Sequence, residues 1–246
     1  MAKGSQPGFS KTRLCPPLTL EEAADLNTAF LRDVAANILS AATSTEIDGY
    51  MAYSPPGCAP FFKSILPARI GLLESWLPNF GDCLLSAITQ LLDRGHHGAV
   101  VLNSDSPTLP TSLLVETAEM LAQPGDHAVL GPSADGGYYL LGLKQPHKRM
   151  FEDIDWSTER VARQTLERAR EIGLSVHTLP AWYDIDDAEA LRTLHAELCG
   201  NIRFTAELQP YSASNTRALL RALIDVTDLS ERLDQTYEDV VERAAE

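Results

Sequence analysis

Acidic residues that follow short apolar runs are the part of this sequence best suited to chemistry. The apolar run 99–102 stops abruptly at the segment Asn103-Ser104-Asp105-Ser106-Pro107. This pattern is typical of a buried strand that brings a carboxylate to the edge of a sheet. A strand predicted over 174–179 likewise precedes Asp184 and Asp186. Because open α/β sheets bind ligands beyond the carboxyl ends of their strands, we expect these three acids to converge.

Convergence of Asp105, Asp184 and Asp186 would suit a hard divalent cation, Mg²⁺ or Mn²⁺, completed by phosphate oxygens and water. Each acid also has a purely structural interpretation. Asp105 could serve as a turn residue, and Asp186 with Glu189 could form an N-terminal capping box. The metal site is the interpretation that accounts for all three acids together.

A third acid-bearing turn follows the apolar run 128–130, which breaks at Gly131-Pro132. Asp135-Gly136-Gly137 then leads into a predicted strand over 138–143, which begins with two tyrosines. Asp135 is either a tight-turn residue or a group that faces the substrate, and the adjacent glycines favour the turn as a minimum.

Two cations lie in the amino-terminal loop, where Gly4, Pro7 and Gly8 disfavour regular structure. Lys11 and Arg13 are two residues apart and can face the same way on an extended backbone. They are candidate phosphate ligands, although such a pair could also be solvated surface cations. The loop lacks the spacing of a Walker motif.

Composition limits the classes of function. Twenty Lys and Arg against 34 Asp and Glu give a net charge of -14, which argues against a nucleic-acid partner. No apolar run approaches the ~20 residues that span a bilayer, and the amino terminus lacks a signal-peptide core, so we expect a cytoplasmic protein without membrane contact. The four cysteines are scattered and predict reduced thiols rather than a zinc site or a disulfide framework.

The elements expected to position these residues alternate between helices and strands. A Thr19–Glu22 capping box begins a helix that follows the 3.6-residue period to about residue 42. We further expect helices over 83–92, after Pro110, after a Ser157 or Thr158 cap, and over 188–198, with strands over 47–53, 99–102, 128–130, 138–143 and 174–179. Residues 58–80, with three prolines, read as an irregular insert. The alternation predicts an α/β fold with a mostly parallel sheet and helices on both faces.

The chain changes character after residue 199. We expect one domain over residues 1–199 and a helical extension over 200–246, with helices near 215–226 and 229–244. This appendage would pack back on the core or on a second copy of the chain in a homodimer.

Several motifs occur in an order that matches a known family. They are Pro7-Gly8-x-x-Lys11-Thr12-Arg13-Leu14, Ser104-Asp105-Ser106-Pro107-x-Leu109-Pro110, Gly131-Pro132-x-x-Asp135-Gly136-Gly137-Tyr138-Tyr139-Leu140-x-Gly142, Trp156-Ser157-Thr158 and Asp184-x-Asp186. Through residue 198 the chain resembles the bacterial nucleotide-diphospho-sugar transferase-like proteins of the arsenosugar-biosynthesis glycosyltransferase type. It also looks distantly like the phospholactate guanylyltransferases.

The resemblance implies a GT-A, Rossmann-like fold and a metal-dependent glycosyltransferase that uses a nucleotide-diphospho-sugar donor and a small-molecule acceptor. Carried over by position, Asp105, Asp135 and Lys11 would be catalytic, and Asp105, Asp184 and Asp186 would hold Mg²⁺ or Mn²⁺. The residues implied in nucleotide or substrate binding are Gly8, Lys11, Arg13, Ser104, Gly136, Gly137, Tyr138 and Trp156.

Three departures from the family pattern keep other functions open. The family has an apolar strand before its Pro-Gly loop, whereas this chain starts at Met1-Ala2-Lys3, so we expect a missing first strand, an uncovered core face and unpaired neighbouring strands. The turn at Gly81-Asp82 lacks the family's Glu and Arg, and Ser104-Asp105-Ser106 has one acid where many glycosyltransferases have two. The alternatives are a nucleotidyltransferase that releases pyrophosphate and a non-catalytic nucleotide-binding protein.

Overall fold

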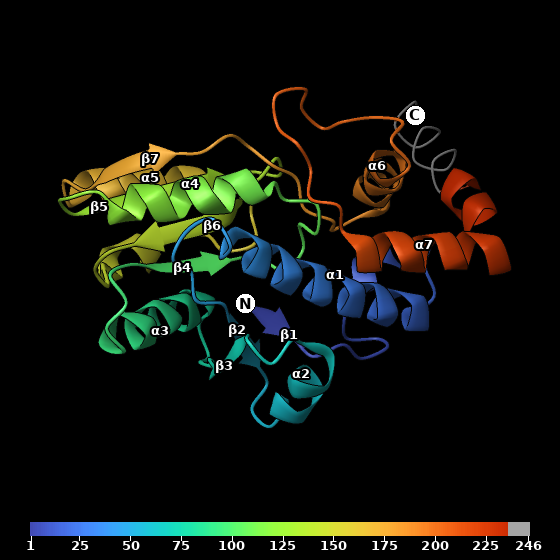
Figure 1. Ribbon diagram of the computed structural model, residues 1–246, viewed down its shortest axis with the longest axis horizontal. Coiled ribbons are helices and arrows are strands. Elements are labelled where there is room, and N and C mark those ends of the chain that lie inside the picture. The colour runs from blue at the N-terminus through green and yellow to red at the C-terminus, as the bar shows by residue number, and fades with distance from the viewer. Residues whose placement is uncertain (236–246) are drawn as a thin grey trace.

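The computed structural model describes residues 1–235. Its strands form two sheets, one of three strands in the order β1-β2-β3 and one of four in the order β4-β6-β5-β7 (Figure 1). The strands are β1 (Ala2–Lys3), β2 (Tyr50–Ser54), β3 (Gly71–Glu74), β4 (Ala99–Leu102), β5 (His127–Pro132), β6 (Tyr138–Leu143) and β7 (Ser175–Thr178). The helices are α1 (Leu20–Ala41), α2 (Ala59–Ile65), α3 (Phe80–Asp93), α4 (Thr111–Ala122), α5 (Val161–Glu171), α6 (Ala188–Leu198) and α7 (Ser214–Val226), with short 3-10 turns at Thr12–Leu14 and Lys148–Phe151.

The predicted α/β class with a mostly parallel arrangement is confirmed. β1, β2 and β3 pair in parallel, and β5 pairs in parallel with β7. β6 runs antiparallel to both β4 and β5, so those two strands share one direction and end at the same edge. This arrangement places the segments after β4, β5 and β7 at one edge of the four-stranded sheet.

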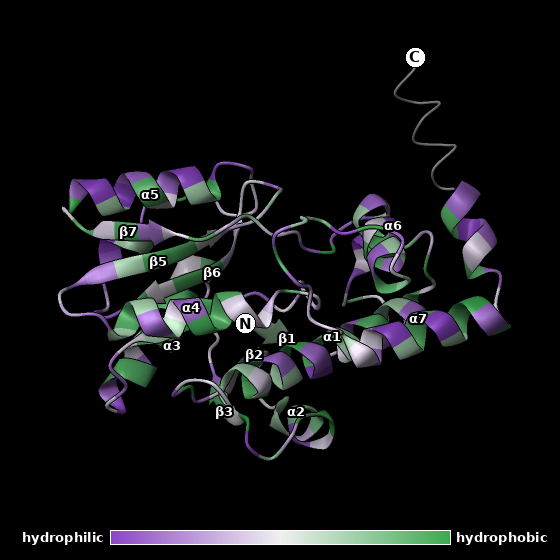
Figure 2. Ribbon diagram, turned by 45° about the horizontal axis from the view of Figure 1, so that its top comes forward, coloured by the Kyte–Doolittle hydropathy of each residue, from purple (hydrophilic) through white to green (hydrophobic). Residues whose placement is uncertain are grey.

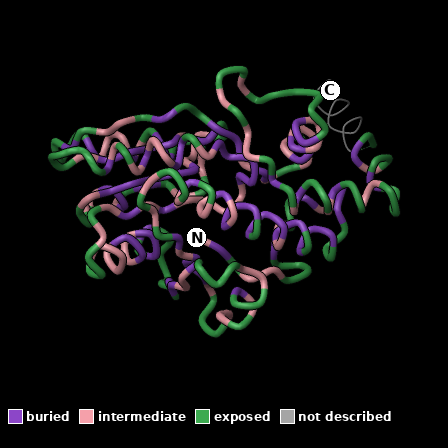
Figure 3. Tube along the Cα trace, in the orientation of Figure 1, coloured by how far each residue is buried: buried purple, intermediate pink, exposed green. Residues whose placement is uncertain are grey.

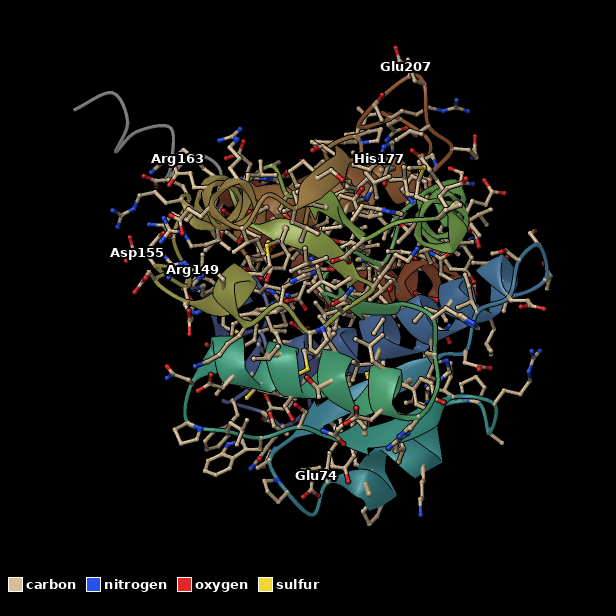
Figure 4. The ribbon with its side chains drawn as sticks, turned by 90° about the vertical axis from the view of Figure 1, so that its left-hand side faces the viewer. Glu74, Arg149, Asp155, Arg163, His177 and Glu207 are labelled. Atoms are coloured by element: carbon tan, nitrogen blue, oxygen red, sulfur yellow. The ribbon has the colours of Figure 1, made fainter. Side chains whose placement is uncertain are left out.

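Helices cover both faces of that sheet because successive strand residues alternate between two cores. Val129 and Leu140 pack with residues of α1 and α4, whereas Leu130 and Leu141 pack with residues of α3 and α5. The strands β5 and β6 are mainly hydrophobic, and α5 is polar over most of its surface (Figure 2). Glu74 at the end of β3 and His177 in β7 lie on opposite sides of the molecule (Figure 4).

Two local expectations were wrong. Residues 58–80 are not irregular but contain α2 and β3. Pro60 lies in the first turn of α2, where a helix tolerates proline because that amide needs no intrahelical partner. The helix expected after Ser157 or Thr158 begins only at Val161, with Arg160 as its N-cap, and the Thr158 hydroxyl instead accepts from the Arg160 amide at 3.3 Å.

The first strand is reduced to two residues, and the sheet is divided beside it. β1 pairs with β2 only through Ala2↔Tyr53 and Lys3↔Ser54. A cavity of about 1250 Å³ lies between the facing edges of β2 and β4, and it is lined by residues of both strands and of α1, α3 and α4. β1 is thus present but short, and no strand lies between β2 and β4 beside the cavity within the described residues.

The carboxyl-terminal segment returns to α1. Both amides at the start of α7, those of Asn215 and Thr216, donate to the buried carboxylate of Asp33 at 3.0 and 2.7 Å. Of the two packing modes considered for the appendage, the described structure shows the one on the core.

The segment between α6 and α7 is largely exposed (Figure 3). Residues 236–244 of the last expected helix lie outside the described residues, while residues 229–235 are helical. The boundary at 199 stays a prediction.

The capping box of α1 is confirmed, and it gives a pH-dependent prediction. The Thr19 hydroxyl accepts from the Glu22 amide at 3.2 Å, while the Glu22 carboxylate accepts from the Thr19 amide at 2.8 Å. The same carboxylate receives a fork of two hydrogen bonds from Arg232, at 2.9 and 2.8 Å. Arg232 thereby holds the pKa of Glu22 below its ordinary value of 4.5.

We expect Glu22→Gln to lower the free energy of unfolding by about 1–2 kcal/mol at neutral pH, because the charged pair is lost while glutamine preserves the capping box. A depressed folded-state pKa stabilises the protein above the unfolded pKa, and this contribution disappears as pH falls through the folded value. Denaturant unfolding of both proteins from pH 7 to pH 3 should show the difference shrinking below about pH 4.5. A difference that stays constant with pH would contradict the assignment.

Candidate functional site

The acids predicted to converge do lie together at the edge where β4, β5 and β7 end. The backbone amide of Ile185 donates to the Asp105 carbonyl at 3.0 Å, and the Ser106 hydroxyl donates to the Tyr183 carbonyl at 2.8 Å. These bonds hold the turn after β4 against the segment after β7. Because Tyr183 and Ile185 are buried, the intervening Asp184 and the following Asp186 project toward the outer side.

The turn after β5 is fixed against the same segment. Trp182 donates its amide to the Pro132 carbonyl at 3.1 Å and accepts from the Ala134 amide at 2.9 Å. Asp135 follows directly, and its Oδ1 accepts from the Gly137 amide at 2.9 Å. The turn interpretation of Asp135 therefore holds, and its exposed carboxylate still lies close enough to Asp184 to affect that group's pKa.

Three other carboxylates lie close enough to Asp184 to affect its pKa. Burial, and after it the neighbouring carboxylates of Asp135, Asp186 and Asp105, together raise the pKa of Asp184 to about 7. Four acids from three separate segments thus form one negatively charged site, which we call the acidic cluster: Asp105, Asp135, Asp184 and Asp186.

Lys11 enters the acidic cluster from the amino-terminal loop. Its Nζ lies 2.9 Å from Asp105 Oδ1 and 3.1 Å from Asp186 Oδ1, and it donates to the Ile185 carbonyl at 2.6 Å. The Lys11 side chain is only 7% exposed and its Nζ lies 5.6 Å from the centre of the Phe30 ring. The interpretation of Lys11 as a solvated surface cation is therefore wrong.

Arg13 is placed differently. Its side chain is 75% exposed, and Nη1 lies 3.9 Å from Asp186 Oδ2. An exposed guanidinium at the rim of an acidic site remains available to an incoming anion. Gly8 lies in the turn that precedes both cations, where its φ of +77° is a conformation that glycine adopts without strain.

The structural alternatives for two acids are also settled. Asp187, not Asp186, caps α6, since its Oδ1 accepts from the Ala190 amide at 2.8 Å. Asp105 is more than a turn residue. Its carboxylate forms an ion pair with Lys11 and accepts a hydrogen bond from the Ser104 hydroxyl at 3.4 Å.

The glycines beside Asp135 shape its turn. Gly136 has a φ of +89°, and a Cβ there would lie 2.2 Å from the Glu159 carbonyl oxygen, so only glycine fits. Tyr138 starts β6 with its hydroxyl buried, and that oxygen has no hydrogen-bond partner among the described residues. Burial alone raises the pKa of Tyr138 well above its ordinary value.

Trp156 packs against this turn rather than against the acids. Its ring makes edge-on contacts with Phe80 and Tyr138, with centroid distances of 5.2 and 6.4 Å. A Cβ at Gly81 would lie 2.9 Å from the Phe151 carbonyl oxygen and 3.0 Å from Trp156 Cζ2. Gly81, which lies in the first turn of α3 rather than before the helix, is thus a close-packing position beside Trp156.

We expect Gly81→Ala to lower the free energy of unfolding by about 1–3 kcal/mol, because the added methyl group meets backbone and a ring that cannot both move away. Alanine otherwise favours a helix over glycine, so an unstrained site would be stabilised. The measurement is the free energy of unfolding by denaturant of Gly81→Ala, with Ser86→Ala on the same helix as the control variant. A Gly81→Ala protein as stable as the parent would show that the contact is not tight.

Two residues that support the site were not predicted from the sequence. Ser106 joins the segments after β4 and β7, and its place in the Ser-Asp-Ser-Pro motif was the available signal. Phe30 supports the Lys11 side chain from α1, and nothing local distinguishes it from an ordinary core residue.

Comparison with known proteins agrees with this fold. Residues 37–158 match the profile of a family described as an uncharacterized protein conserved in bacteria (DUF2064). Among solved structures, a proposed nucleotide-diphospho-sugar transferase from Desulfovibrio desulfuricans G20 is 26% identical, with a TM-score of 0.77 over 95% of this chain and 94% of that chain. The chain is similar to the nucleotide-diphospho-sugar transferases. No curated protein matches it.

The acidic cluster offers oxygen ligands for a cation but not a complete set. No group of three or more His, Cys, Asp or Glu side chains within residues 1–235 has a geometry that could hold a metal ion. Lys11 already pairs with Asp105 and Asp186, whereas burial, followed by the negative charge of the neighbouring carboxylates, raises the pKa of Asp184. Mg²⁺ commonly takes one or two protein carboxylates and completes its shell with phosphate oxygens and water. The acidic cluster fits that partial role.

In the described part of the chain, no helix is both long enough and apolar enough to cross a membrane.

Proposed function

We propose that this protein transfers a glycosyl group from a nucleotide-diphospho-sugar to a small-molecule acceptor. The observation that carries the proposal is the acidic cluster with Lys11 at its centre, at the sheet edge where an α/β fold binds ligands. Similarity to the Desulfovibrio protein supports the same donor class.

In the proposed mechanism, the cationic side chains and the acids have different roles. Arg13 and Lys11 would bind the diphosphate and stabilise the negative charge that develops as it leaves the sugar. A bound Mg²⁺ or Mn²⁺, held by one or two carboxylates from among Asp105, Asp184 and Asp186 and otherwise by phosphate oxygens and water, would supply additional positive charge at the same diphosphate.

Asp135 would face the acceptor. Its Oδ1 is oriented by the Gly137 amide, which fixes the carboxylate for removal of a proton from the acceptor hydroxyl. Ser104 and the backbone of Gly136 and Gly137 would border the nucleotide sugar, and Trp156 with Tyr138 would form the wall behind them. Gly8 would give the cationic loop the turn that it needs to reach the phosphates.

Ligand binding tests the donor class. We expect one nucleotide-diphospho-sugar, among UDP-, GDP-, CDP- and dTDP-sugars, to raise the melting temperature more strongly with Mn²⁺ or Mg²⁺ than without it. A ligand specific for the folded state stabilises by roughly 2.7 kcal/mol at a hundred times its dissociation constant. The four nucleoside triphosphates serve as the comparison set.

The outcome separates the alternatives. A shift with a nucleoside triphosphate alone, together with pyrophosphate release, would replace the proposal with nucleotidyl transfer. Binding of a nucleotide sugar without turnover of any acceptor or of water would favour a non-catalytic binding protein. Absence of any shift from a folded sample would contradict the proposal.

A further inference from the structure

The ammonium group of Lys11 has no N–H left for a ligand. Its Nζ lies 2.9 Å from Asp105 Oδ1, 3.1 Å from Asp186 Oδ1 and 2.6 Å from the Ile185 carbonyl oxygen. A lysine ammonium has three N–H donors, so these three protein oxygens occupy all of them. Lys11 can therefore bind a diphosphate, as the proposed function requires, only by leaving at least one of these oxygens.

The position of the Lys11 ammonium also suits a metal cation. Two carboxylates and a backbone carbonyl surround it, and oxygens of these two kinds are ligands that Mg²⁺ and Mn²⁺ accept. The Phe30 ring centre lies 5.6 Å from Nζ and favours positive charge there. An ammonium and a divalent cation cannot share this position, because their positive charges repel and the same oxygens would have to serve both.

If Lys11 left without a replacement, two negative charges would lose their partner. Asp105 and Asp186 would then lie beside an incoming diphosphate with no cation between them, which is unfavourable in a partly buried site. A divalent cation that arrives with the diphosphate avoids this, since it binds carboxylates on one side and phosphate oxygens on the other. The flexible four-carbon stem of lysine allows the side chain to move while the Lys11 carbonyl keeps its 2.9 Å bond to the Leu14 amide.

We propose that Lys11 holds the cation position of the acidic cluster in the ligand-free protein and gives it up to a divalent cation when the diphosphate binds. The displaced ammonium then donates to the phosphate oxygens. Binding of the cation and of the diphosphate is thereby coupled, and the cation binds weakly alone. The part played by the diphosphate rests on the proposed function, whereas competition between Lys11 and the cation is a property of the protein without any nucleotide.

The first test measures the dissociation constant of Mn²⁺ alone, from the electron paramagnetic resonance signal of free Mn²⁺, with no nucleotide present. We expect Lys11→Met to bind Mn²⁺ about 10- to 100-fold more tightly than the parent, because the cation no longer has to break hydrogen bonds to charged groups. Arg13→Met is the matched control. It removes the same charge from the same loop, but its side chain is 75% exposed and lies 3.9 Å from Asp186. We expect the control to change the dissociation constant by less than about threefold.

The second test uses the unmodified chain and so does not depend on how well a variant folds. Acetylation of lysine side chains, located by mass spectrometry of peptides, is compared with and without excess Mn²⁺. Lys11 is only 7% exposed in the ligand-free protein, so we expect it to react slowly alone and several-fold faster with Mn²⁺. Lys63, which is exposed on α2, should react equally under both conditions.

Three results would overturn the proposal. They are a Lys11→Met protein that binds Mn²⁺ no more tightly than the parent, equal tightening by Lys11→Met and Arg13→Met, and acetylation of Lys11 that Mn²⁺ leaves unchanged. If Lys11→Met does not fold, the acetylation result decides. Failure of the proposed function is distinguishable, because the search for a nucleotide-sugar donor can fail while Mn²⁺ still displaces Lys11.

Discussion

Replacing Asp105 with asparagine is expected to reduce turnover by about 1000-fold or more while the protein remains folded. Asp105 bonds to Lys11 at 2.9 Å and contributes to the field at Asp184, so its charge sets the position of the cation and the balance of the acidic cluster. Removing one oriented electrostatic group at a reacting centre costs about 10²–10³ in rate, and Asp105 has two such roles in the proposed mechanism.

The measurement is kcat/KM with the donor identified by thermal shift, accompanied by the melting temperature of each protein. Asp187→Asn is the matched control, because it removes the same charge two residues beyond the Tyr183–Ile185 segment while asparagine still caps α6. We expect the control to retain near-parental activity. Equal activity of Asp105→Asn and Asp187→Asn would contradict a catalytic role for the acidic cluster.

The cation dependence of the same variants refines the result. If Asp105 holds part of a divalent cation, the Mn²⁺ concentration needed for the nucleotide-sugar thermal shift should rise in Asp105→Asn and remain unchanged in Asp187→Asn. If turnover is lost but the required Mn²⁺ concentration is unchanged, Asp105 acts by positioning Lys11 and not by holding the cation.

Replacing Asp33 with alanine is expected to lower the free energy of unfolding by about 3–4 kcal/mol. The carboxylate is fully buried and accepts from the amides of Asn215 and Thr216 and from the Asn215 side chain, at 2.7–3.0 Å. Removing it leaves buried donors at the start of α7 without partners, and each such group costs about 1–3 kcal/mol. A negative charge at a helix N-terminus is also favourable in itself.

The measurement is the free energy of unfolding by denaturant of Asp33→Ala and of a control variant, Asp25→Ala, which lies at an exposed position on the same helix. We expect Asp25→Ala to have little effect, and Asp33→Asn to fall between the two because it keeps one acceptor oxygen. Limited proteolysis should cleave within or after α7 faster in Asp33→Ala. Similar stabilities of Asp33→Ala and Asp25→Ala would show that α7 does not depend on this cap.

Local patterns in the sequence were sufficient for much of the framework. The capping box of α1 and the strands before Asp105, Asp135 and Asp184 follow from hydrophobic period and turn residues, which act over a few positions. Because strands with a common direction end at a common edge, convergence of the acids also followed from the sequence alone. The short elements α2 and β3 were missed because the prolines around them were taken for breakers of structure. Pro60 lies in the first turn of α2, and Pro67 and Pro78 lie outside both elements.

Contacts between distant segments decided the rest. The sequence placed Lys11 and Asp186 as separate candidates, but only the fold brings them together across 175 positions and buries the lysine among acids. Asp33 has the pattern of an ordinary helical residue, and its role as the cap of α7 depends on a partner 183 positions away. The cavity between β2 and β4 depends likewise on how far β1 reaches along its neighbour. Burial and pairing of this kind are properties of packing, whereas the local pattern fixes only which residues are available for it.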